Sequence, residues 1–284
     1  MNIRGLIQEL EQTLREGGIA SARAEAEWLI AGRLGLSRTE LYLREEPLRA
    51  QDVEILEGWV DRRLAGEPLQ YVVGHTQFVG HRLEVSRDVL VPRPETEGLV
   101  DEASRYLETL TRRGISPWVL DLGTGSGNIA LSLSLAIPSC LVVAVELSWN
   151  ALRAAQANLH RHRLQDRVYL VHAEWTQGLL RRPRFDLVIS NPPYVPTNHV
   201  HGLPREVGYE PRLSLDGGHD GMAFHRRLMT EAPAFLRRDR ALCMECAESQ
   251  AGALSQLASR QPWVREVMIM EDLAGRPRGL WVAS

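Results

Sequence analysis

Two short segments of the 284-residue sequence combine residue types that can bind a charged ligand and hold a reacting group. In the first, residues 121–127 (Asp-Leu-Gly-Thr-Gly-Ser-Gly), alternate glycines let the backbone turn sharply and approach a ligand closely. The segment departs from the dinucleotide pattern G-x-G-x-x-G because residue 128 is Asn. A carboxylate at Asp121 would repel a pyrophosphate and attract an amine or sulfonium, so the segment favours S-adenosylmethionine over NAD.

Acidic residues follow the next two expected strands. Glu146 lies roughly 20 residues beyond the glycines, where an acid can accept both ribose hydroxyls of a nucleoside. Glu174 can meet an adenine amino group and Trp175 can cover the ring, although plain core packing is the alternative for this tryptophan. The predicted cofactor-binding residues are Asp121, Gly123, Thr124, Gly125, Ser126, Gly127, Glu146, Glu174, Trp175 and Asn191.

The second segment is Asn191-Pro192-Pro193-Tyr194, which suits the task of holding a planar NH₂ group. The Asn191 side-chain oxygen and the Pro192 carbonyl can each accept one N–H, and Pro193 keeps Pro192 extended. Tyr194 offers a stacking face. Two acceptors would orient the nitrogen for in-line attack on a methyl group and help to remove its proton. We predict these four residues to be catalytic and expect no histidine or carboxylate base beside them; a proline-rich strand terminator is the alternative.

The elements that must position these segments alternate between strand and helix after residue 117. Both segments would face one crevice if the strand ending near Asp121 neighbours the strand ending at Asn191. Such βα alternation predicts an α/β fold with a mostly parallel sheet that is covered on both faces. We predict strands at Trp118–Leu122, Leu141–Leu147, Val168–His172, Phe185–Ser190, Ala241–Cys246, Val264–Met270 and Gly279–Val282, and helices from Asn128 to Leu135 and from about Glu95.

The first part of the chain is different. Residues 1–70 predict a small all-helical domain, with Ser21 as a helix N-cap and with Ser37 and Glu40 as a capping box. Short strands are predicted at Tyr71–Val73, Phe78-Val79, Leu83–Val85 and Val89–Val91. We therefore expect a β-hairpin linker over residues 71–94 and a catalytic domain over 95–284, with Arg93 and Thr96 as further candidates for lining the active site.

Composition excludes several functional classes. The 33 basic residues are all arginine, which excludes lysine Schiff-base chemistry and a P-loop lysine. A net charge of −3 argues against affinity built on many phosphate contacts with a nucleic acid.

Cys243 and Cys246 lie three positions apart in an expected strand and should point to opposite faces, so we expect neither a metal nor a disulfide there. Without a secretory signal or a spanning apolar run, we expect a soluble, cytoplasmic protein.

Together these segments resemble the class I methyltransferase fold and, more narrowly, the protein-(glutamine-N5) methyltransferases of the HemK/PrmC family, which modify peptide-chain release factors. The chain has Glu146 and Glu174 where Asp is frequent in that family. The resemblance extends to Val91–Glu97, Tyr209-Glu210-Pro211, Asp216-Gly217-Gly218, Asp220-Gly221 and, as a terminal hairpin, Asp272-Leu273-Ala274-Gly275-Arg276-Pro277-Arg278.

The resemblance implies a seven-stranded sheet ordered 3-2-1-4-5-7-6. It also implies methylation of the glutamine in the Gly-Gly-Gln motif of a class I release factor, with S-adenosylmethionine as donor and S-adenosylhomocysteine as product. The helical domain would recognise the protein substrate, and we expect a monomer that contacts neither nucleic acid nor membrane. The alternatives are a glutamine methyltransferase for a ribosomal protein, a nucleic-acid amino-group methyltransferase, and a non-catalytic cofactor-binding protein that would have lost Asn191 or Tyr194.

Overall fold

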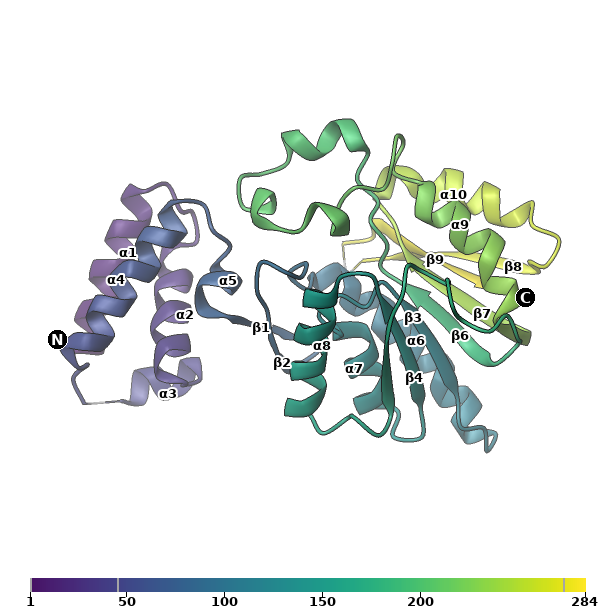
Figure 1. Ribbon diagram of the computed structural model, residues 1–284. Coiled ribbons are helices and arrows are strands. Elements are labelled where there is room, and N and C mark those ends of the chain that lie inside the picture. The colour runs from purple at the N-terminus through teal and green to yellow at the C-terminus, as the bar shows by residue number, and fades with distance from the viewer. Residues whose placement is uncertain (1, 45, 273) are drawn as a thin grey trace. The chain divides into compact units, whose positions relative to one another are not determined.

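The computed structural model describes residues 2–44, 46–272 and 274–284, which form two compact units (Figure 1). One unit extends to His75 and also includes Pro204–Tyr209, and the other comprises Thr76–Leu203 and Glu210–Ser284. Met1 and Glu45 of the expected helical domain and Leu273 of the expected terminal hairpin lie outside the described residues. None of the helices in the described part of the chain is long and apolar enough to cross a membrane.

The first unit is helical. Among its described residues the helices are α1 (Ile3–Glu16), α2 (Ala22–Leu34), α3 (Arg38–Leu43), α4 (Ala50–Leu64) and α5 (Leu69–Val73). The capping box of Ser37 and Glu40 begins α3 as predicted. Ser21 is the N-cap residue of α2 as predicted, but its hydroxyl donates to the Glu25 carboxylate and caps no backbone N–H.

The segment Pro204–Tyr209 joins this unit through polar contacts. Arg63, which is buried at the end of α4, donates to Glu25 at 2.6 Å and to Glu206 at 2.6 Å. The Tyr209 hydroxyl donates to the Ala65 carbonyl at 3.0 Å. A stretch of chain that follows the second motif in sequence is thus held by the helical unit.

Two predicted strands are wrong. Tyr71–Val73 is the end of α5, where Leu69 and Val72 pack into the core of the helical unit and Gly74, at a φ of 84°, ends the helix. A short apolar run carries no periodicity that distinguishes a strand from a helical turn. Val89–Val91 also forms no strand. The other two predicted strands, Phe78-Val79 and Leu83–Val85, overlap the hairpin of β1 (His75–Phe78) and β2 (His81–Glu84).

The second unit contains the predicted seven-stranded, mostly parallel sheet. Its order is β5-β4-β3-β6-β7-β9-β8, which is 3-2-1-4-5-7-6 when counted from β3, and β9 runs antiparallel to both of its neighbours. The strands are β3 (Trp118–Leu122), β4 (Leu141–Glu146), β5 (Val168–His172), β6 (Phe185–Ser190), β7 (Leu236–Glu245), β8 (Glu266–Glu271) and β9 (Pro277–Ala283). The fold is that of the class I methyltransferases.

Helices cover both faces of this sheet (Figure 1). One core lies under α6 (Pro94–Arg112), α7 (Asn128–Ala136) and α8 (Trp149–Arg161), and the other under α9 (Ala223–Glu231) and α10 (Ala251–Ser259). Successive strand residues such as Val119 and Leu120 enter opposite cores, which explains the continuously apolar strands. Short 3-10 turns occur at Thr197–Gly202, Val207–Tyr209, Arg212–Ser214, Ala232–Ala234 and Glu248–Gln250.

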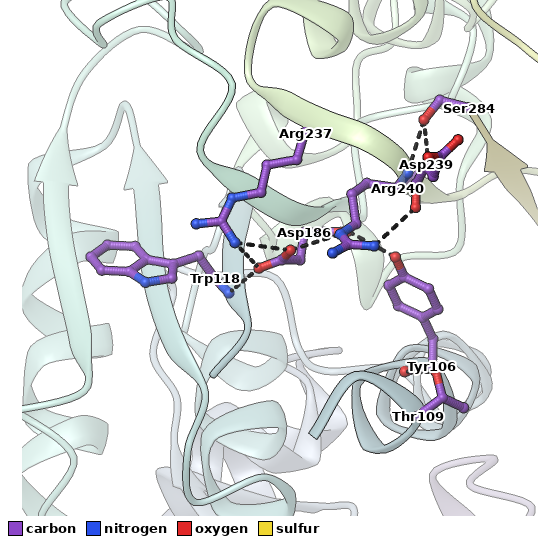
Figure 2. A network of polar contacts seen from close by, with 8 residues as sticks. All are labelled: Tyr106, Thr109, Trp118, Asp186, Arg237, Asp239, Arg240 and Ser284. Atoms are coloured by element: carbon purple, nitrogen blue, oxygen red, sulfur yellow. Dashed lines mark hydrogen bonds and ion pairs between the residues drawn. The ribbon is translucent and has the colours of Figure 1, made fainter. Parts of the chain in front are cut away.

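A buried carboxylate, Asp186, stabilises the amino-terminal end of the sheet (Figure 2). Asp186 accepts the Trp118 backbone N–H at 2.9 Å, the Arg240 side chain at 2.7 Å and the Arg237 side chain at 3.1 Å. These polar partners explain why β7 begins at Leu236, five residues before its predicted start, although residues 237–240 are not apolar.

Candidate active site

A cavity of about 420 Å³ lies at the carboxyl ends of the parallel strands. Asp121 in β3 pairs with Ile189 in β6, so the two motifs leave neighbouring strands at the same edge of the sheet. The chain order also reverses between these strands, which is where α/β sheets bind ligands. Of the predicted site residues, those that line the cavity are Gly123, Thr124, Gly125, Ser126, Glu146, Glu174, Trp175, Asn191 and Pro193; Asp121, Gly127, Pro192 and Tyr194 do not.

The glycine-rich loop is closed by Glu146. Gly123, Gly125 and Gly127 have φ of 75°, 55° and 79°, the left-handed conformation that glycine adopts most readily. The Glu146 carboxylate accepts the Gly125 N–H at 2.9 Å and the Ser148 N–H at 2.8 Å. Each carboxylate oxygen retains a further acceptor site, so Glu146 can bind a ligand hydroxyl while it fixes the loop.

Asp121 is fully buried beside this loop. One oxygen, Oδ2, accepts the Thr124 hydroxyl at 2.6 Å, whereas Oδ1 has no hydrogen-bond partner among the described residues. Burial raises the pKa of Asp121 to about 7, although the hydrogen bond from Thr124 opposes that rise. A buried carboxylate oxygen without a partner fits a cationic group of a ligand, because the pair would offset the cost of burying the charge.

Trp175 and two residues of α9 form an aromatic and cationic wall of the cavity. Trp175 is buried, and its ring lies 5.0 Å from the Phe224 ring and 5.8 Å from the Arg227 guanidinium. Arg227 also forms a 3.4 Å ion pair with Glu174. Phe224 and Arg227 line the cavity as well, and the sequence contained no motif that distinguished them from ordinary helix residues.

Behind Asn191 lies a chain of hydrogen bonds that ends at a buried acid. Asn191 Nδ2 donates to Thr96 Oγ1 at 3.0 Å, and the Thr96 hydroxyl donates to Glu245 Oε2 at 2.6 Å. The Tyr194 hydroxyl donates to Glu245 Oε1 at 3.2 Å. A carboxylate that the sequence analysis did not identify therefore stands behind the second motif, although it does not line the cavity. Residues 241–244 are Ala-Leu-Cys-Met, and Glu245 follows them directly. A single acid at the end of a buried strand was the only feature of the sequence that could have pointed to Glu245.

The backbone of the second motif is held by a glycine-containing segment. A Cβ at Gly221 would lie 2.2 Å from the Tyr194 carbonyl oxygen, and one at Gly217 would lie 2.7 Å from the Pro193 oxygen. Gln250 Nε2 donates to the Tyr194 carbonyl at 2.9 Å. These contacts explain Gly217 and Gly221 of the Asp216-Gly217-Gly218 and Asp220-Gly221 segments, because only glycine leaves room for the motif at these two positions.

Arg93, at the start of α6, does not line the cavity and instead donates to Glu210 at 2.7 Å. Pro211 and Leu213, which follow Glu210 closely, do line the cavity. Arg93 thus fixes a wall segment of the site.

The two cysteines that lie three positions apart do not face each other. The three cysteines are free and buried, and Cys243 and Cys246 enter opposite cores of the sheet. No group of three or more His, Cys, Asp or Glu side chains within residues 2–44, 46–272 and 274–284 is arranged to hold a metal ion.

Comparisons with known proteins agree with this architecture. Residues 5–74 match the PrmC N-terminal domain family, and residues 96–203 match the methyltransferase small domain family. The chain is 39% identical over 264 residues to the release factor glutamine methyltransferase of Geobacter sulfurreducens, covering 91% of this chain and 88% of that protein. It is 37% identical over 279 residues to the release factor glutamine methyltransferase of Moorella thermoacetica, covering 98% and 97%.

Solved structures share the fold at low sequence identity. The hMettl16 catalytic domain in complex with MAT2A 3'UTR hairpin 6 superposes with a TM-score of 0.57 at 16% identity, covering 83% of this chain and 81% of that one. A methyltransferase from Pyrococcus furiosus gives a TM-score of 0.51 at 19% identity, covering 72% and 89%.

Proposed function

We propose that this chain, which belongs to the family of release factor glutamine methyltransferases, methylates the side-chain nitrogen N5 of the glutamine in the Gly-Gly-Gln motif of class I peptide-chain release factors. It is an S-adenosylmethionine-dependent methyltransferase. The observation that carries the proposal is that the glycine-rich loop and Asn191, on neighbouring strands, line the same cavity of about 420 Å³. One space of that size can hold a nucleoside-sized donor and the end of a side chain.

The residues on one side of the cavity suit the donor. Glu146 has acceptor capacity for ribose hydroxyls, Trp175 covers the adenine and Glu174 accepts from its amino group. The unpartnered Oδ1 of Asp121 supplies the negative charge that favours a cationic ligand. When bound, S-adenosylmethionine supplies an activated methyl group on a sulfonium.

The second motif acts on the acceptor. An amide nitrogen is a weak nucleophile because its lone pair is delocalised, so its orientation matters most. As the N–CH₃ bond forms and the S–CH₃ bond of the donor breaks, the sulfur leaves as a neutral thioether and the nitrogen loses one N–H proton to solvent. Asn191 Oδ1 and the Pro192 carbonyl accept the two N–H groups of the glutamine amide and aim its nitrogen at the methyl group. These acceptors also stabilise the positive charge that develops on the nitrogen during transfer.

The proposal also covers how the protein substrate, the release factor, would be recognised. The helical unit would recognise the release factor, and support comes from the match of residues 5–74 to a domain that is found in such methyltransferases. One chain supplies every group that the proposed mechanism uses, so we expect it to act as a monomer. A net charge of −3 fits a protein substrate better than a nucleic acid.

The test is to incubate the purified protein with isotopically labelled donor and, in parallel, with release factor, total ribosomal protein and DNA. Mass spectrometry then locates the label. We expect a single methyl group on the glutamine of Gly-Gly-Gln in the release factor. Label on a ribosomal glutamine would reassign the substrate, and label on a base or on no glutamine would overturn the proposal.

A further inference from the structure

A buried carboxylate stands behind the second motif without touching the cavity. Glu245, at the end of β7, is only 2% exposed and does not line the cavity. It receives two hydroxyl hydrogen bonds, one from Thr96 in α6 and one from Tyr194. Burying an acid is costly, and its neighbours here include the motif that we propose to bind the substrate amide.

The direction of these hydrogen bonds decides how Asn191 faces the cavity. A threonine hydroxyl has one hydrogen, and a carboxylate can only accept. When Thr96 gives its hydrogen to Glu245 at 2.6 Å, only a lone pair is left to face Asn191. Asn191 must then present its NH₂ to Thr96, at 3.0 Å, and this turns its carbonyl oxygen away from Thr96.

We infer that Glu245 is a positioning residue for the proposed methyl transfer: acting through Thr96, its carboxylate makes Asn191 present an oxygen acceptor to the substrate amide. The inference rests on the proposed function, because the substrate that requires an acceptor there is an NH₂ group. A proton on Oε2 of Glu245, the oxygen that Thr96 contacts, would reverse the relay. Protonated Glu245 donates to Thr96, Thr96 donates to the Asn191 oxygen, and the Asn191 NH₂ then opposes the NH₂ of the substrate.

This relay should respond to pH near neutrality. Burial raises the pKa of Glu245 to about 7, and the hydrogen bonds from Thr96 and Tyr194 oppose that rise. Glu95 in α6 raises the pKa further and Arg278 in β9 lowers it. The other titratable groups around it are His225 of α9, whose ring nitrogen lies 2.8 Å from the Glu245 carbonyl oxygen, and Cys243 and Cys246 on its own segment.

The first test is the pH dependence of kcat at saturating donor and release factor. For the unaltered protein we expect kcat to rise through about pH 7 as Glu245 ionises. Glu245→Gln removes the titrating carboxylate, so it should remove the rise of kcat with pH and leave the KM for the donor within twofold. Asp186→Asn is the matched control: it alters another buried acid of the same sheet and should keep the rise.

A second pair of variants tests the relay if Glu245→Gln fails to fold. Thr96→Ser keeps the hydroxyl and should retain both kcat and its pH dependence. Thr96→Val removes the hydroxyl and should lose both. Equal kcat values and equal pH profiles for these two variants would overturn the inference.

A spectroscopic readout separates this inference from the proposed function. The side-chain ¹⁵NH₂ signal of Asn191, assigned with Asn191→Asp, should have a higher protection factor, which is the intrinsic exchange rate at each pH divided by the observed rate, above about pH 7 than below it. Glu245→Gln should make that protection factor independent of pH. If the protein methylates no glutamine but the protection follows pH as described, the substrate proposal fails and the relay stands. If the protection does not depend on Glu245, the relay fails whatever the substrate is.

Discussion

Glu146 accepts the backbone N–H of Gly125 at 2.9 Å, which joins the end of β4 to the glycine-rich loop that follows β3. Its second oxygen accepts the Ser148 N–H at the start of α8. A residue predicted from sequence as a ribose acceptor therefore also shapes the loop on which the donor would rest.

Replacing Glu146 with Gln should weaken donor binding. The variant loses the charge and turns an NH₂ toward one of two backbone donors, so about 1.5–3 kcal/mol of charged hydrogen bonding is lost. We expect the donor Kd, measured by calorimetry, to rise about 10- to 100-fold. Glu108→Gln, which alters a half-exposed acid in α6, is the control. Equal donor affinity in both variants would show that Glu146 does not contact the donor.

Asp121→Asn should stabilise the free protein at pH 8 and weaken donor binding. Since the folded-state pKa of Asp121 is about 7, above its unfolded value, its ionisation destabilises the fold progressively from about pH 4 to 7. At pH 8 the full cost, about 4 kcal/mol, is present, and Asn removes it while still accepting from Thr124. We expect a Tm several degrees higher than wild type at pH 8 and nearly equal at pH 4.

Donor binding to the unaltered protein should weaken as the pH falls below about 7, because Asp121 becomes protonated. Asp121→Asn should bind weakly at every pH. Calorimetry from pH 5.5 to 8.5 checks this. A flat profile for the unaltered protein would mean that Asp121 plays no part in attracting the donor.

Asn191→Ala should abolish methyl transfer while the donor still binds. The variant removes one of the two proposed acceptors for the substrate amide, and loss of one such group typically costs about 10²–10³-fold in kcat. Donor Kd should change by no more than a few fold. Asn198→Ala, at an exposed position beyond the motif, should behave as wild type. A near-normal kcat for Asn191→Ala would refute the acceptor-pair mechanism.

Gly221→Ala should lower kcat without preventing folding. A Cβ at Gly221 would lie 2.2 Å from the Tyr194 oxygen, at a φ of 74°, so the motif backbone has to shift. A displacement near 1 Å at a reacting centre costs about a hundredfold in rate. Gly252→Ala in α10 is a matched control, since nothing lies within 4 Å of its new Cβ. Similar kcat values for the two variants would show that the motif tolerates the shift.

Asp186→Asn should lower stability and leave donor affinity unchanged. The variant leaves Arg237 and Arg240 without a carboxylate at the end of the sheet opposite to the cavity (Figure 2). Both arginines are partly exposed, so we expect a loss of about 2–3 kcal/mol in the free energy of unfolding. Chemical denaturation and calorimetry measure the two effects separately. A loss of donor affinity would show that the two ends of the sheet are coupled.

Much of the sheet could be predicted because its strands are apolar runs bounded by turn residues. β3, β5 and β6 begin and end where the sequence predicted, at Trp118–Leu122, Val168–His172 and Phe185–Ser190. The start of β7 could not be predicted, because residues 237–240 are polar, and two of them, Arg237 and Arg240, bind Asp186, which is distant in the chain. The strand predicted at Tyr71–Val73 is wrong because three consecutive apolar residues fit a helical turn as well as a strand.

The site residues that could be predicted from the sequence were mainly those that lie together in a short local segment of the chain. The two motif segments were found by spacing. Thr96 was a candidate for lining the active site, but it lies behind Asn191 and does not line the cavity. Glu245 was missed because its partner Thr96 lies 149 positions away, and no local pattern records such a contact. Phe224 and Arg227 were missed for the same reason, as they face Trp175 only through the packing of α9.

The crossing of Pro204–Tyr209 into the helical unit has a consequence for how the chain can be divided. Removing residues 1–75 would not release an intact remainder, because Glu206 and Tyr209 would lose Arg63 and the Ala65 carbonyl as partners. The stretch that loses these partners begins about ten positions after Tyr194. A shortened chain without the helical unit would therefore need a redesigned loop at Pro204–Tyr209 that satisfies these polar groups in another way.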